Sequence, residues 1–133
     1  MKSTYLADKF LAKVLTGEDF TVTNVYVGLM VNGVEVSGGN YAREQLDKTK
    51  WATPVNYAGG GRVRNYTEQV AFAEATAPWG DIDQFFLADA ASGGNVLYGP
   101  ENIKDLNGND TVIHIGTGET FIFKPLQLSV VEK

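Results

Sequence analysis

The chain has 133 residues, 44% of them hydrophobic and 20% charged, which is typical of one globular domain and excludes a disordered or fibrous chain. The formal net charge of −5, with 11 Lys and Arg residues, excludes the basic surface on which nucleic-acid affinity depends. Without any cysteine, the chain forms no disulfide, thiolate metal site or thiol nucleophile.

The N-terminal segment predicts one amphipathic helix over residues 4–16. Ser3 or Thr4 can serve as the N-cap, and Gly17 is placed to end the helix. The apolar residues that recur at helical spacing are Leu6, Phe10, Leu11, Val14 and Leu15.

The same segment is not typical of a signal peptide, because Asp8 and Lys9 interrupt its apolar residues. No apolar run of about 18 residues, long enough to span a bilayer, follows. We therefore expect a soluble protein, made in the cytoplasm of the cell that expresses it, with no membrane partner.

After the helix, the pattern changes to that of short β-strands. Residues 24–31 are rich in β-branched and aromatic side chains, and Asn32-Gly33 is suited to a tight hairpin turn. Residues 34–36 then form the returning strand. A second turn over residues 37–40 leads into an extended segment at 41–46.

The middle of the chain is less regular. The signal is mixed over residues 47–61, where Ala58-Gly59-Gly60-Gly61 indicates a flexible loop. Residues 64–73 alternate well enough to predict one strand. Its core-facing side chains are expected to be Tyr66, Val70 and Phe72.

The remaining segments repeat this pattern of strand and turn. Strands are expected at 82–88 and 95–98, with a turn at 92–94, and then at 111–115, 120–123 and 126–131, with a turn at 116–118. Strands spaced this way indicate a mainly β protein, an antiparallel sandwich or barrel with a short N-terminal helix. No internal boundary divides residues 1–133, so we expect a single domain.

Few residues are candidates for chemistry. His114 is the one histidine, so a triad or a histidine-rich metal site has no partners, and we expect a structural or solvent-facing role. Residues 105–110 resemble the start of a calcium loop, but the loop's glycine and its final glutamate, which would fall at Gly116, are missing. A turn between strands is the favoured interpretation. No cofactor or metal is expected.

Carboxylates around residues 82–88 leave a catalytic alternative open. A glycosidase needs two carboxylates at a set separation, which the sequence does not fix. The available acidic residues are Glu68, Glu74, Asp81, Asp83 and Asp89. Gly59-Gly60-Gly61-Arg62 lacks the Lys-Ser/Thr of a phosphate loop, so we interpret it as a mobile loop.

Aromatic side chains near the Gly-rich loop are candidates for partner binding, because they offer stacking faces for sugars or anchors for protein partners. The candidate interaction residues are Trp51, Tyr57, Arg62, Tyr66 and Trp79. Most aromatic residues in a domain of this size must belong to the core.

Six segments, taken in order, resemble a family of small proteins of tailed phages that are commonly labelled tail-fibre proteins. They are the N-terminal helix and residues 24–29, 35–43, 70–73, 79–82 and 86–99. Residues 48–64 depart from the family pattern. The most specific segment contains Asp89-Ala90-Ala91-Ser92-Gly93-Gly94-Asn95, where two glycines permit positive φ and Asp89 can bind turn N–H groups.

The resemblance implies a jelly-roll-like β-sandwich of the virion, without catalytic activity. The leading hypothesis is a capsid decoration or cement protein that binds the major capsid protein and other copies of itself, as a homotrimer. A tail-fibre or tail-tip accessory protein that binds tail proteins is the first alternative. A carbohydrate-binding module for host recognition is the second, and a glycan hydrolase using Asp81, Asp83 or Glu74 is the third.

Overall fold

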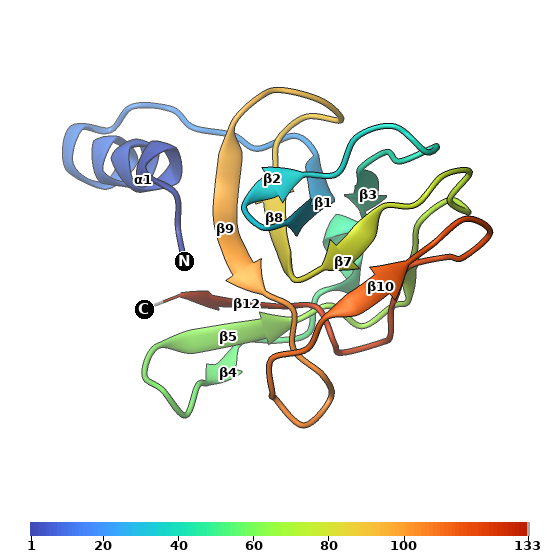
Figure 1. Ribbon diagram of the computed structural model, residues 1–133. Helices are drawn as coiled ribbons and strands as arrows, with labels where there is room; N and C mark the ends of the chain where they lie inside the picture. Colours follow the sequence, from blue (N-terminus) through green and yellow to red (C-terminus); the bar gives the residue numbers. More distant parts are fainter. Residues whose placement is uncertain (133) are drawn as a thin grey trace.

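The computed structural model describes residues 1–132 and is mainly β, with one α-helix near the N-terminus (Figure 1). Lys133, the last residue of the predicted domain, lies outside the described residues. The elements are α1 (Thr4–Thr16), β1 (Val25–Val31), β2 (Val34–Glu35), β3 (Glu44–Leu46), η1 (Lys48–Lys50), β4 (Val55–Asn56), β5 (Arg62–Asn65), β6 (Val70–Ala71), β7 (Gly80–Ile82), β8 (Gln84–Ala88), β9 (Val96–Asn102), β10 (Ile113–Ile115), β11 (Ile122–Phe123) and β12 (Ser129–Glu132).

Helix α1 has the limits and the caps that the sequence predicts. The Ser3 hydroxyl oxygen accepts a hydrogen bond from the Leu6 N–H at 3.1 Å, so it satisfies one of the free N–H groups of the first turn. Gly17 ends the helix in the left-handed conformation, at φ 73°.

The largest sheet has the order β2-β1-β8-β9, and β3 pairs with the other part of β1. The hairpin between β1 and β2 turns at Asn32 and Gly33, whose φ angles of 49° and 79° are those of the predicted turn. Strand β9 lies at the sheet edge, which allows Pro100 within the strand because a proline cannot donate a ladder hydrogen bond.

A second sheet, β12-β5-β4, lies below the first in Figure 1. Two smaller sheets, β10-β7 and β11-β6, complete the pairing of residues 1–132, and every pair of strands among these residues is antiparallel. The predicted class, an antiparallel sandwich with a short N-terminal helix, is confirmed.

The core is a cluster of aromatic and branched side chains between the sheets. Phe121 packs edge-to-face on Phe72 and on Phe123, with ring centroids 5.6 and 4.9 Å apart. Trp79 packs on Tyr41 in the same way at 5.5 Å. As predicted, Tyr66, Val70 and Phe72 face this core.

One predicted strand is wrong. Residues 64–73 form two strands in different sheets, because β5 pairs with β12 and β6 pairs with β11. Residues 82–88 are also divided, at Asp83, between β7 and β8. The strand predicted at 95–98 extends to Asn102. These partners are distant in sequence, so the local alternation of residues carries no signal of the change of sheet.

Candidate interaction surface

Helix α1 exposes an apolar surface. Phe10, Leu11, Val14 and Leu15 lie on one side of the helix, and 52, 52, 61 and 74% of their surfaces are exposed. We call these four residues the α1 face. No residue of α1 is buried. Contiguous exposed apolar side chains of this kind are typical of a protein-binding surface.

The residues before α1 are hydrogen-bonded to the edge of β9. The Ser3 N–H donates to the Leu97 carbonyl oxygen and the Gly99 N–H donates to the Met1 carbonyl oxygen, each at 2.9 Å. Lys2 forms an ion pair with Glu132. The helix then lies to one side of β9, away from the packed sheets (Figure 1). Its position is therefore set by the arm before it, and the α1 face is left open.

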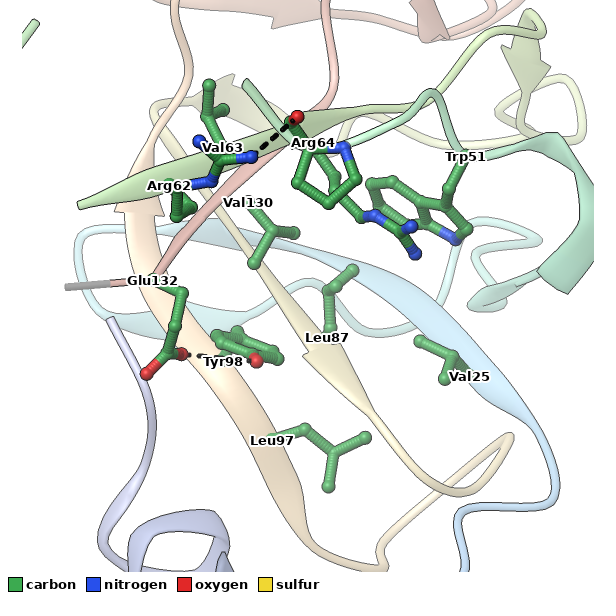
Figure 2. Close-up of a pocket in the computed structure, with 11 residues that line it drawn as sticks. Val25, Trp51, Arg62, Val63, Arg64, Leu87, Leu97, Tyr98, Val130 and Glu132 are labelled. Atoms are coloured by element: carbon green, nitrogen blue, oxygen red, sulfur yellow. Dashed lines mark hydrogen bonds between the residues drawn. The ribbon is translucent and has the colours of Figure 1, made fainter. Parts of the chain in front are cut away.

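A groove of about 520 Å³ lies between the two main sheets. We call it the intersheet groove. In Figure 2, Val25, Leu87 and Leu97 line it from β1, β8 and β9, and Val63 and Val130 line it from β5 and β12. The remaining lining residues are Trp51, Pro54, Arg62, Arg64, Tyr98 and Glu132. The groove is thus mainly apolar, with charged side chains from β5 and β12.

Some polar groups of the groove already have hydrogen-bond partners within the chain. The Tyr98 hydroxyl lies 3.4 Å from a Glu132 carboxylate oxygen, and burial, followed by the negative charge of Glu132, raises the pKa of Tyr98. Arg62 donates to Asn56 Oδ1 and to the Pro54 carbonyl oxygen. Within residues 1–132, neither Arg62 nor Arg64 forms an ion pair with a carboxylate.

The structure brings three of the predicted interaction residues together. Trp51 and Arg62 line the intersheet groove, and the buried Tyr66 ring packs edge-to-face under Trp51 at 5.1 Å. Tyr57 lies at a separate, smaller pocket, and Trp79 is buried, with its indole N–H donating to the Gly39 carbonyl oxygen at 2.9 Å. The role of these residues in binding stays a prediction.

Most residues of the groove carry no local signal in the sequence. Val25, Leu97, Tyr98 and Val130 come from three distant parts of the chain, and each has the pattern of an ordinary strand residue. The apolar side of α1, in contrast, was visible as helical periodicity.

Arg43 joins two of the segments on which the family resemblance depends. Its guanidinium donates to both carboxylate oxygens of Glu35 at 2.9 Å, and to the carbonyl oxygens of Ala90 and Gly93 at 2.8 and 2.9 Å. It also stacks on the Phe86 ring, 5.0 Å from the centroid. Only 7% of the Arg43 side chain is exposed.

The loop that Arg43 holds has the predicted shape. The Asp89 carboxylate accepts the Asn95 N–H at 2.7 Å, which is the main reason that the pKa of Asp89 is lowered. A Cβ at Gly94, where φ is 69°, would lie 2.6 Å from Ala90 Cβ. Residues 89–95 therefore form a pre-organised turn on the surface.

Two of the candidates for chemistry, His114 and Asp81, lie side by side. His114 Nδ1 lies 2.8 Å from Asp81 Oδ1 on the exposed surface. Asp105 Oδ1 accepts the N–H groups of Asn107 and Asn109, as expected of a turn. Among residues 1–132 there is no cluster of three or more metal-ligating side chains, and no helix is long and apolar enough to cross a membrane.

Comparison with known proteins gives one family. A family model described as podophage GP4 fiber I protein gp80 matches residues 1–125. No curated protein gives a significant match. The matched range includes α1, the Arg43 network and every strand except β12.

Proposed function

The chain belongs to the family described as podophage GP4 fiber I protein gp80, and on that premise we propose that it is a non-enzymatic structural component of the phage tail fibres. A member of this family is a virion protein of a phage. The protein acts by binding its neighbours, which are other fibre proteins and further copies of itself.

The α1 face is the observation that carries this proposal. Four large apolar side chains stay more than half exposed on a helix whose preceding residues are hydrogen-bonded to β9. Exposure of such a surface to water is unfavourable, and the free energy falls when a partner covers it. Repeated weak contacts between many copies hold firmly through multivalency, so each interface need not be large.

The position on the particle is part of the proposal. The family description supports the tail fibres. Decoration of the capsid shell, with the major capsid protein as partner, is the hypothesis that the sequence favoured, and it would use the same apolar surfaces.

Fractionation of purified particles into heads and tails distinguishes a position on the tail fibres from one on the capsid shell. Quantitative mass spectrometry of each fraction should find this chain enriched with the tail proteins, with the major capsid protein as the marker for heads. Enrichment with the heads instead would refute the tail-fibre proposal and support decoration. Absence from both fractions would refute a structural role.

Carbohydrate binding is a second candidate, favoured by Trp51, Arg62 and Arg64, which all line the groove. An aromatic face with charged neighbours can stack on a sugar ring and bind its hydroxyl groups. A host glycan that quenches Trp51 fluorescence, but not the fluorescence of a Trp51→Phe variant, would support this function. An array of host glycans without any binding would refute it.

A further inference from the structure

The N-terminal part of the chain is an appendage to the sheets. It consists of an arm (residues 1–3), helix α1 and a link without helix or strand (residues 17–24) that leads into β1. None of residues 1–26 is buried, and the buried core begins at Val27. In Figure 1 the helix lies to one side of the sheets. The core is therefore built without this segment.

The arm is attached in the manner of an additional strand. The Ser3 N–H donates to the Leu97 carbonyl oxygen, which begins an antiparallel pairing with β9. The Gly99 N–H donates to the Met1 carbonyl oxygen. Strand β9 is the edge of the largest sheet, and a sheet edge accepts an extended segment from any chain that reaches it.

We propose that this segment is exchanged between copies, so that the arm of one copy pairs with β9 of a second copy. The inference deepens the proposed function and rests on the self-association that it includes. It names a second copy as the partner and the edge of β9 as its binding site. The exchanged pairing has the same hydrogen bonds as the pairing within one chain, and only the path of the link differs.

The ion pairs of the arm can also be exchanged. Lys2 pairs with Glu132 in β12, and the Met1 amino group pairs with Glu101 in β9, so both carboxylates lie on the accepting side. Lys2 Nζ also lies 4.8 Å from the centre of the Phe10 ring, a contact within the segment that moves with it. The accepting copy therefore offers an exchanged arm every partner named here.

The link is long enough for exchange and is held by exposed contacts. Fully extended, residues 17–24 span up to about 26–29 Å, close to the diameter of a small domain. Lys48 Nζ donates to the Val22 carbonyl oxygen at 2.6 Å, and Gln45 Nε2 donates to Asn24 Oδ1 at 3.1 Å. Water can replace both partners when the segment opens, so opening costs little.

The local concentration of arms decides between the two pairings. A short link holds the arm near its own β9 at an effective concentration on the order of 1 mM. Copies fixed side by side in a fibre present their arms to one another at a similar concentration, so exchange competes there with closure. Exchange around a symmetry axis, as in the expected homotrimer, leaves no β9 edge open.

The first test uses disulfides that can form only between chains, because the chain has no cysteine of its own. Lys2 and Tyr98 lie opposite each other in the pairing, where Cα atoms are about 4.5–5.5 Å apart, within reach of a disulfide. Lys2→Cys protein is mixed with Tyr98→Cys protein at about 1 mM in a glutathione buffer. The control replaces the second variant with Val112→Cys, at a side chain that is 59% exposed elsewhere.

Mass spectrometry of the disulfide-linked pairs then counts the mixed species. We expect at least about ten times more of the Lys2→Cys and Tyr98→Cys pair than of the control pair. Equal yields of the two pairs would overturn the proposal.

The second test changes the length of the link and leaves the paired residues intact. Deletion of residues 19–22 shortens the link by about 13 Å, which hinders closure within one chain and favours exchange. Its control inserts Gly-Ser-Gly-Ser at the same point. In sedimentation equilibrium the dissociation constant of the short variant should lie at least about 100-fold below that of wild type. A short variant that stays at the 14.4 kDa mass of one chain up to about 1 mM would overturn the proposal.

The final test is made in assembled particles that carry Lys2→Cys and Tyr98→Cys in the same chain. After oxidation, a non-reducing gel should show copies joined to one another, whereas single chains with an internal disulfide alone would overturn the exchange. That result would leave the chain in the tail fraction, and so would leave the proposed function standing. Absence of the wild-type chain from the tails would refute the function itself.

Discussion

The replacement Arg43→Lys tests whether one side chain holds the surface loop to the main sheet. The arginine makes four hydrogen bonds of 2.8–2.9 Å, two to Glu35 and two to the loop carbonyls, and stacks on Phe86. Lysine keeps the charge but cannot reproduce the planar fork. We expect the variant to keep the fold and lose the link between Glu35 and residues 89–95.

The magnitude follows from the bonds that lysine cannot make. Each charge-assisted hydrogen bond contributes about 1.5–3 kcal/mol, and the loss is smaller where water can replace the partner, as at the exposed Gly93 carbonyl. Counting one lost bond to Glu35 and one to the loop, with that discount, gives a loss of about 2–4 kcal/mol in the free energy of unfolding.

Urea unfolding followed by tryptophan fluorescence measures this loss, with an unchanged m-value as the sign that the folded state is intact. Arg64→Lys is the control, because Arg64 is exposed and forms no ion pair among residues 1–132; it should change stability by less than about 0.5 kcal/mol. In the variant, hydrogen exchange should also accelerate at the Asn95 amide. An Arg43→Lys effect as small as that of the control would refute the reasoning.

Three further predictions concern stability. Burial works against ionisation of Glu35, but hydrogen bonds from Arg43 and Tyr41 lower its pKa below 4.5. Its contribution to the stability of the fold is therefore complete above pH 4.5 and is lost as the pH falls through the lowered pKa. Thermal melts from about pH 7 to about pH 3 should show a steeper fall of the melting temperature for wild type than for Glu35→Gln. Gly28→Ala would place a Cβ 2.3 Å from Phe86 Cζ and should cost about 1–3 kcal/mol in urea unfolding, and an unchanged stability would contradict this close contact. Phe121→Ala empties the centre of the aromatic core and should cost about 3–5 kcal/mol by the same assay, and a loss under 1 kcal/mol would contradict the packing described.

The features that the sequence predicted correctly are those with a local cause. The helix at residues 4–16 follows from the spacing of its apolar residues and from Ser3 and Gly17, which act on their immediate neighbours. The turn at Asn32-Gly33 follows from the positive φ that both residues tolerate. In each case the determining contacts lie within a few residues.

The features that could not be predicted depend on distant partners. The chain leaves one sheet and enters another between β5 and β6, since the partners of these strands are β12 and β11 near the C-terminus. The intersheet groove exists only once Val25, Leu97 and Val130 are brought together. No local pattern marks such residues, because a groove residue and a core residue are both apolar strand positions.

Cryo-electron microscopy of the intact particle tests the central claim most directly. The claim predicts density for this domain on the tail fibres, with each α1 face covered by a neighbouring chain. Density on the capsid lattice, or isolated domains on the fibres with α1 open to solvent, would contradict it.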